Sequence, residues 1–257
     1  MLEIKNLTKI FSPGTVNEKL ALKNVDLRLA PGDFVTIIGS NGAGKSTLMN
    51  CIAGVHGSDG GSIRLDGQEI TKLPEHKRAK MIGRVFQDPL KGTAFDMTIE
   101  ENLSIAYHKN RHRGLRPGIS RKERELFQEK LRLLDMGLEN RMQEKARLLS
   151  GGQRQALTLF MAIIAEPKLL LLDEHTAALD PGAAKKVLEL TDLFSQDQNM
   201  CTMMITHNMK AALEHGNRSI LMQDGQIAMD ITGAEREAMT VETLIERFEI
   251  QNDRMLL

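Results

Sequence analysis

The chain has 257 residues, of which 41% are hydrophobic and 26% charged, and 34 Lys and Arg residues balance 34 Asp and Glu residues. This length suits one sizeable core with an inserted lobe, and the balanced charge gives no global argument for a nucleic-acid partner. The longest apolar stretch, residues 157–165, is far shorter than the roughly 20 residues that span a bilayer, so a membrane role would require a partner.

The N-terminal residues and the two cysteines indicate the cellular compartment. Residues 1–5 lack the charged start of a secretion signal, and no apolar segment with a small-residue cleavage site follows, so we expect no such signal. Cys51 and Cys201 stand alone, without a CxxC spacing. They indicate reduced cytosolic thiols, not a disulfide framework or a metal site.

Residues 2–36 predict antiparallel strands with one solvated face, because apolar and polar positions alternate there. The loop between these strands holds Phe11, Pro13 and Gly14. Residues 34–38 form a continuous apolar run, which is typical of a central strand covered on both faces.

A helix is expected from about Ser46 to Gly54, with the glycine as its C-cap. Next, residues 62–65 and 68–70 flank Asp66-Gly67, the strongest short-range hairpin signal. After Gln87 strand-like runs vanish until Lys168, so we expect the stretch between them to be an inserted helical lobe.

Capping boxes mark two helices of this lobe. Ser120 with Glu123 opens a helix on which Phe127, Leu131, Leu134 and Leu138 are expected to share one face, and Ser150 with Gln153 opens an apolar helix that Pro167 ends. Residues 168–172 and 201–205 are predicted as the remaining core strands. Between them Asp180 is expected to cap a helix over 182–194 with Pro181 at N1, and 233–257 reads as a polar helix.

A glycine-rich loop after the apolar strand carries the strongest chemical signal. It satisfies G-x-x-x-x-G-K-[ST] in the required context of a buried strand before it and a helix after it. Its glycines let backbone N–H groups approach phosphate oxygens, Lys45 is expected to pair with the terminal phosphates, and the Ser46 hydroxyl to hold Mg²⁺. The loop comprises Gly39, Ser40, Asn41, Gly42, Ala43, Gly44, Lys45, Ser46 and Thr47.

Three further strand ends carry polar side chains that suit phosphate cleavage. Asp173 fits a holder of Mg²⁺ and Glu174 a base that polarises the attacking water. Gln87 has an amide that can reach Mg²⁺ or that water, and His207 can orient the water and stabilise the terminal phosphate. Each alone is more often a surface or structural residue, but ligands of open parallel sheets bind beyond the carboxyl ends of the strands, where all of these fall.

Together the phosphate loop, LSGGQ at 149–153, LLLLDE at 169–174, ALD at 178–180 and His207 resemble the ATP-binding cassette ATPases of ABC transporters. The resemblance implies ATP and Mg²⁺ as cofactors. It also implies an α/β fold, with a phosphate-loop NTPase core on a mostly parallel sheet, an N-terminal antiparallel β subdomain and an inserted α-helical subdomain. The expected parts are 1–87 with 160–232 as the core, 88–159 as the helical subdomain and 233–257 as a tail.

The family pattern also implies roles for residues outside the phosphate loop. Phe11 would stack on adenine, and Asp180 would sit across a dimer seam. Ser150, Gly151, Gly152 and Gln153 would serve the ATP held by the opposite subunit of a homodimer or heterodimer. His175 stands where proline is common in the family and is expected to tune the turn at Glu174 without abolishing catalysis.

Transport through a separate permease is the preferred function, with residues 88–107 meeting that permease at the cytoplasmic face of the membrane. Import of a small solute such as an amino acid, with the help of a solute-binding protein, is favoured over export of a lipid or peptide. A soluble ABC ATPase is the alternative from another class, although neither a second cassette nor a long coiled coil is present. The basic stretch 108–124 is expected to be a solvated face, because charge runs usually are. Nucleic-acid binding is the alternative, although no aromatic residues interleave these charges for stacking on bases.

Overall fold

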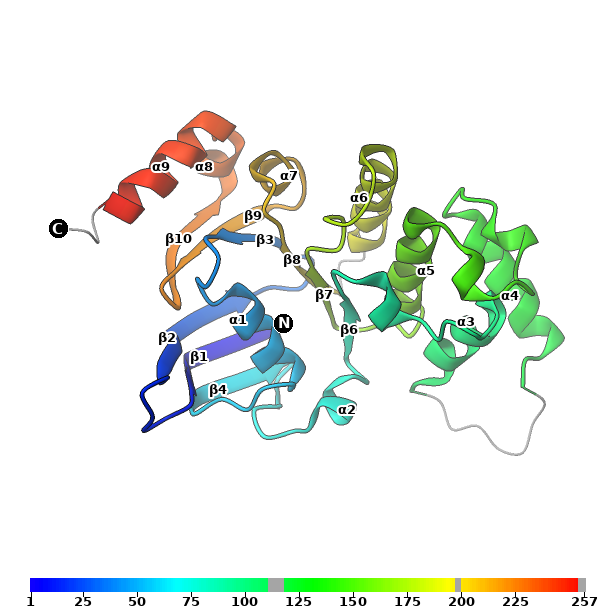
Figure 1. The fold of residues 1–257 in the computed structure, drawn as a ribbon, viewed down its shortest axis with the longest axis horizontal. Helices are drawn as coiled ribbons and strands as arrows, with labels where there is room; N and C mark the ends of the chain where they lie inside the picture. The colour runs from blue at the N-terminus through cyan, green and yellow to red at the C-terminus, as the bar shows by residue number, and fades with distance from the viewer. Residues whose placement is uncertain (111–117, 197–199, 254–257) are drawn as a thin grey trace.

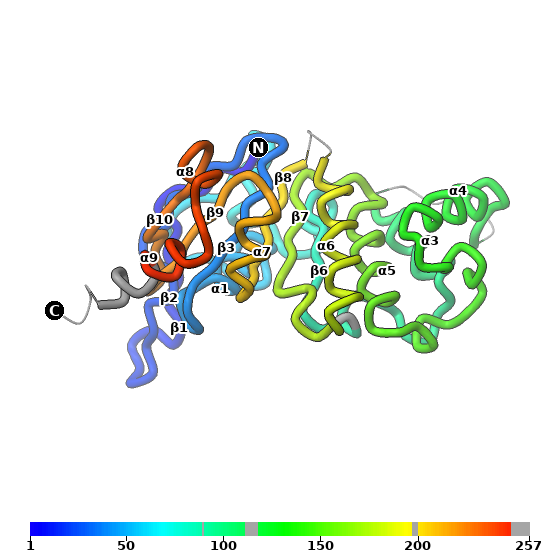
Figure 2. Tube along the Cα trace, turned by 90° about the horizontal axis from the view of Figure 1, so that it is seen from above, coloured from blue at the N-terminus to red at the C-terminus, as the bar shows by residue number. Residues whose placement is uncertain are grey.

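Two β-sheets and a helical lobe make up the structure, a computed structural model that describes residues 1–110, 118–196 and 200–253 (Figure 1). The antiparallel sheet and the C-terminal helices lie towards one end of the long axis, and helices α3 and α4 lie at the other (Figures 1 and 2). Arg111, Arg113 and Arg116, which belong to the predicted basic face, lie outside the described residues.

The antiparallel sheet has the strand order β2-β1-β4-β5, with β1 (Leu2–Phe11), β2 (Lys19–Leu29), β4 (Gly60–Leu65) and β5 (Gln68–Glu69). The strands predicted from alternation are confirmed, although Phe11 ends β1 and does not lie in the loop. The Asp66-Gly67 hairpin is confirmed too, since both residues have the positive φ of a type I′ turn, +53° and +80°.

The second sheet has the order β10-β9-β3-β8-β7-β6 and is parallel except at β10, as predicted for the core. Its strands are β3 (Phe34–Gly39), β6 (Ile82–Val85), β7 (Leu169–Asp173), β8 (Cys201–Ile205), β9 (Arg218–Gln223) and β10 (Gln226–Thr232). Leu169 and Leu171 pack towards the antiparallel sheet and α1, whereas Leu170 and Leu172 pack towards the helical lobe. Burial on both faces explains why this strand reads as an uninterrupted apolar run.

The prediction that β7 and β8 are the last core strands is wrong, because β9 and β10 follow them. These strands form an antiparallel hairpin around Asp224 and Gly225, whose φ angles of +46° and +79° repeat the geometry of the first hairpin. The same Asp-Gly signal was therefore present in the sequence. Strand β9 pairs with β3, which places the hairpin beside the phosphate loop.

Helices cover both faces of this sheet. Gly54 caps α1 in the left-handed conformation with φ +85°, and the Asp180 side chain accepts from the Ala183 N–H at 3.0 Å, so both predicted caps are confirmed. The helices are α1 (Lys45–Ala53), α2 (Glu75–Arg78), α3 (Ile99–His108), α4 (Arg121–Arg132), α5 (Gly151–Ile163), α6 (Pro181–Ser195), α7 (Met209–Glu214), α8 (Gly233–Glu237) and α9 (Val241–Asp253). Short 3₁₀ turns are η1 (Pro89–Gly92), η2 (Leu138–Asn140) and η3 (Ala146–Leu148).

In the helical lobe the capping boxes at Ser120 and Ser150 are confirmed. The expected single helical stripe is wrong in its second half, because α4 ends at Arg132. Leu134 and Leu138 are fully buried all the same, since the turn after α4 and η2 fold them back onto the same core. Within the described residues, no helix has both the length and the apolar character needed to cross a membrane.

Candidate functional site

The loop after β3 is held in a shape that only glycine permits at two points. Gly39 has φ +152°, and a Cβ there would lie 2.3 Å from the Met222 carbonyl oxygen. Gly44, the N-cap of α1, has φ +100°, and a Cβ there would lie 2.8 Å from the Ala21 carbonyl oxygen. The hairpin β9–β10 and strand β2 therefore press the loop into place at the N-terminus of α1.

Lys45 lies inside this loop and is 5% exposed. Its Nζ donates to the carbonyl oxygens of Gly39 and Ser40, both at 2.9 Å. Burial lowers the pKa of Lys45, while the nearby carboxylates of Glu174 and Asp173 act in the opposite direction. A cation surrounded by loop amides at a helix N-terminus is a site for phosphate oxygens.

A pocket of about 210 Å³ opens beside the loop. Seven of the predicted nucleotide-site residues and the predicted base border this pocket. Lys19 and Ala21 also border it and were not among the predicted site residues. Both lie on β2, and no local sequence pattern indicates that the start of this strand faces the loop. The lining consists of Phe11, Lys19, Ala21, Asn41, Gly42, Gly44, Lys45, Ser46, Thr47 and Glu174.

The other loop residues, Gly39, Ser40 and Ala43, support the pocket from behind. Gly39 and Ser40 supply the carbonyl groups that hold Lys45, and the buried Ala43 accepts at its carbonyl from the Gly225 N–H at 3.0 Å.

Two residues from distant parts of the chain contact the Glu174 carboxylate. His207 Nε2 lies 2.6 Å from Oε1, and Gln87 Nε2 donates to Oε2 at 3.2 Å. Because a carboxylate only accepts, Nε2 of His207 carries the proton in this contact. The structure therefore brings the predicted base, the predicted water-orienting histidine and the hinge glutamine into one hydrogen-bonded group.

Asp173 and Ser46 supply oxygen atoms that suit Mg²⁺. Arg84 Nη2 lies 4.0 Å from the Asp173 carboxylate. Burial raises the pKa of Asp173 despite the opposing charges of Arg84 and Lys45. No group of three or more His, Cys, Asp or Glu side chains within the described residues could hold a metal, so Mg²⁺ here would also need phosphate and water ligands.

The residues of LSGGQ lie elsewhere. Helix α5 stands apart from α1 in both views, and among the described residues that line the pocket none comes from 150–153 (Figures 1 and 2). Ser150 and Gly151 are exposed, and so is Asp180 at the start of α6, near which Gly151 packs against Leu179. The Gln153 amide is used inside its own lobe, where it accepts from the Ser150 N–H and donates to the Met136 carbonyl, both at 3.2 Å.

His175 directly follows the predicted base and is 2% exposed. Its Nε2 lies 3.0 Å from Thr191 Oγ1, whose own hydroxyl donates to the Val187 carbonyl at 2.8 Å. The threonine proton is thus committed, and His175 Nε2 must donate. Burial lowers the pKa of His175 to about 4, so the ring is neutral and anchors the turn of Glu174 to α6.

Comparisons with known proteins agree with this geometry. A family model described as ABC transporter matches residues 22–177. A tyrosine transport ATP-binding protein of Clostridioides difficile is 44% identical over 97% of this chain and 99% of its own length. A methionine import ATP-binding protein of Clostridium tetani is 34% identical over 89% of this chain and 68% of its own length.

Solved structures show the same fold. A dimeric ATP-binding cassette in a post-hydrolysis state, bound to ADP and Pi, superposes with a TM-score of 0.75 at 29% identity. The superposition covers 90% of this chain and 98% of that one.

Proposed function

The chain belongs to the ABC transporter family and is the ATP-hydrolysing subunit of a transporter, and from this premise we propose that it drives import of an amino acid through a separate membrane permease. The proposal places the chain on the cytoplasmic face of the membrane. The 44% identity to a tyrosine transport ATP-binding protein supports the amino-acid substrate. The contact of Gln87 with Glu174 supports coupling to a permease, because it joins the site of hydrolysis to the start of the helical lobe.

In the proposed hydrolysis, Glu174 accepts a proton from the attacking water and His207 orients that water and the terminal phosphate. Each oxygen of Glu174 accepts one hydrogen bond in this structure, one from His207 and one from Gln87. Each oxygen keeps a further lone pair, so these contacts orient the base and leave it able to accept a proton from water. Because Gln87 also begins the helical lobe, a shift of the lobe would reorient the base, which would couple hydrolysis to the position of the lobe.

The pocket supports a defined pose for ATP. Adenine would stack on Phe11, the phosphates would lie along the loop from Gly39 to Thr47, and Lys45 would exchange its two carbonyl contacts for terminal phosphate oxygens. Ser46, Asp173 and Gln87 would hold Mg²⁺, which neutralises charge on the phosphates when bound.

We further propose that the chain works as a dimer with two-fold symmetry. Ser150, Gly151, Gly152 and Gln153 form the N-terminus of α5 away from the chain's own pocket. Ser150 and Gly151 are exposed and are available to the ATP of a partner, whereas Gly152 is buried and would act through the close packing of this helix start. Asp180 lies close to this helix start and would border the seam. In this arrangement Gln153 acts by holding Ser150 in its capping position, since its amide is already engaged.

Residues 88–107 are the proposed contact with the permease. Within this stretch Leu90, Phe95 and Ile105 are 49%, 37% and 56% exposed, so apolar side chains are available there to a partner. The stretch begins directly after Gln87, whose side chain hydrogen-bonds to Glu174. Movement of a docked permease would therefore be transmitted to Glu174 by Gln87. The proposal keeps the division into core (1–87 and 160–232), helical lobe (88–159) and tail (233–257).

Uptake of labelled amino acids tests the function. In cells of the organism that encodes the chain, we expect deletion of the gene to lower tyrosine uptake, and the wild-type chain but not Glu174→Gln to restore it. Tyrosine is the first substrate to test because of the 44% identity to a tyrosine transport ATP-binding protein. Methionine uptake, measured in parallel, shows whether the effect is specific.

Other outcomes point to the alternatives. Accumulation of the amino acid in the deletion strain would indicate export. A chain that purifies alone from detergent-solubilised membranes, with uptake unchanged by deletion, would contradict transport and favour a soluble ABC ATPase.

A further inference from the structure

Lys19 is the second cation at the edge of the nucleotide pocket, and no motif of the chain includes it. It is the first residue of β2 and the direct cross-strand partner of Phe11, the last residue of β1. Both residues line the pocket. The hairpin thus places an aromatic ring and an ammonium group side by side at one end of the site.

The ammonium group also reaches the phosphate loop. Lys19 Nζ lies 3.6 Å from the position that a Cβ on Gly42 would occupy. The ammonium group therefore lies next to the loop at a residue that has no side chain. A Cβ at Gly42 would therefore be in ordinary van der Waals contact with the Lys19 ammonium group.

The charges around Lys19 leave it free for an anion. Within the described residues no carboxylate pairs with it, and the adjacent Glu18 instead accepts from the Gly14 N–H at 2.6 Å. Lys9, two residues before Phe11 on the adjacent strand β1, is by comparison paired with Asp59 at 3.1 Å. Lys45, the other cation of the pocket, sits deeper and is held by two carbonyl groups.

We propose that Lys19 is a nucleotide-binding residue that contacts the α-phosphate of ATP. The inference rests on the proposed pose: with adenine on Phe11 and the terminal phosphates at Lys45, the ribose and α-phosphate occupy the part of the pocket that Lys19 borders. Such a contact exists equally in ATP, ADP and the transition state. It therefore strengthens nucleotide binding without accelerating the chemical step.

Binding measurements on Lys19→Gln test the inference. We expect the dissociation constants for ATP and ADP to rise by the same factor, roughly three- to tenfold as for an exposed charge-assisted contact, while adenosine binding stays the same. KM for ATP should rise by a similar factor, and the dependence of ATP affinity on salt should weaken. Lys19→Arg should restore most of the affinity.

Lys122→Gln, which removes an exposed lysine of α4, is the matched control and should bind all three ligands like the wild type. Unchanged ATP and ADP binding by Lys19→Gln at low salt would overturn the role of Lys19 while leaving the proposed function intact. An equal loss of adenosine binding or a lowered melting temperature would show that Lys19 supports the hairpin and not the phosphate. Failure of the wild-type chain to bind ATP would overturn both the inference and the proposed function.

Discussion

Glu174 adopts a left-handed backbone conformation with φ +47°, which is uncommon for a residue with a side chain. It follows the end of β7, and its N–H donates to the Ile205 carbonyl at 3.1 Å. Two neighbours, His175 and His207, act on it in different ways, since one anchors the turn to α6 and the other binds the carboxylate. Strained backbone conformations of this kind cluster at functional sites, where the surrounding structure holds them.

Replacing the base should separate binding from hydrolysis. For Glu174→Gln we expect kcat for ATP to fall by roughly 10²- to 10⁴-fold, because an amide cannot accept the proton, while the dissociation constant for ATP changes little. Steady-state hydrolysis and equilibrium binding measure the two quantities. Normal hydrolysis by this variant would rule out Glu174 as the base.

The buried His175 should make stability depend on pH. Its pKa is lowered to about 4 in the folded chain and returns to 6.5 on unfolding, so between these values only the unfolded chain binds the proton. Its contribution is therefore fully present above pH 6.5 and is lost as the pH falls towards 4, by at most about 3 kcal/mol.

Denaturant titrations between pH 4.5 and 7.5 check this expectation. His175→Gln should flatten the pH dependence, whereas His76→Gln, at an exposed position of α2, should not. Equal slopes for the wild type and His175→Gln would show that the folded chain accommodates a charged ring.

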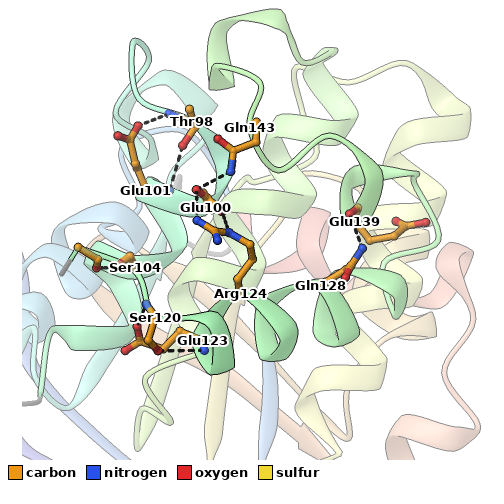
Figure 3. Close-up of polar contacts among 11 residues, drawn as sticks. Thr98, Glu100, Glu101, Ser104, Ser120, Glu123, Arg124, Gln128, Glu139 and Gln143 are labelled. Carbon is orange, nitrogen blue, oxygen red and sulfur yellow. Dashed lines mark hydrogen bonds and ion pairs between the residues drawn. The ribbon is translucent and has the colours of Figure 1, made fainter.

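At the scale of elements, the helical lobe is organised by polar contacts around Glu100 (Figure 3). This carboxylate on α3 accepts from Arg124 Nε of α4 at 2.7 Å and from Gln143 Nε2 at 2.6 Å. The N-termini of both helices carry capping boxes, Thr98 with Glu101 and Ser120 with Glu123 (Figure 3). Local caps start the helices, and Glu100 fixes how they pack.

Removing the Glu100 carboxylate should lower the free energy of unfolding more than removing an exposed carboxylate of the same lobe. Glu100 is 7% exposed, so Glu100→Ala breaks a buried hydrogen-bond network and should lower the free energy of unfolding by about 2 kcal/mol. Glu125→Ala removes an exposed partner of Arg121 in the same lobe and should cost about 0.3 kcal/mol. Denaturant melts of the two variants would contradict this picture if they gave equal losses.

For the whole molecule, the separation of α5 from the nucleotide pocket is the decisive feature (Figures 1 and 2). Strands of the central sheet lie between α5 and α1, and no residue of 150–153 lines the pocket, so Ser150 cannot complete the chain's own site without a large rearrangement. In the proposed dimer, a second copy of the cassette would supply this contact with no change of fold.

This arrangement predicts a dimer that depends on ATP. Glu174→Gln, which should retain ATP, is expected to sediment as a dimer with ATP and as a monomer without it. Adding Ser150→Arg should abolish that dimer, because a long side chain would block the exposed face at the start of α5. A Glu174→Gln chain that stays monomeric at saturating ATP would speak against the paired arrangement.

The features that the sequence predicts are those set by residues close to one another along the chain. The phosphate loop, the Asp66-Gly67 turn, the caps at Ser120, Ser150 and Asp180, and the buried strand before Asp173 were all readable. Each is determined by residues within a few positions of one another, through backbone conformation, hydrogen bonding or alternating burial. The turn at Asp224-Gly225 is just as local, and its Asp-Gly pair carries the same hairpin signal.

The chain by itself thus determined the elements and the chemistry of the individual side chains. Only the tertiary structure decided which of them meet: Gln87 with Glu174 across 87 positions, and Lys19 with the loop at Gly42. It also decided that Leu134 and Leu138 are buried beyond the end of their helix, and that Ser150 lies away from the pocket. The physical reason is that such contacts follow from strand order and from the packing of helices on the sheet, and no local sequence pattern encodes either.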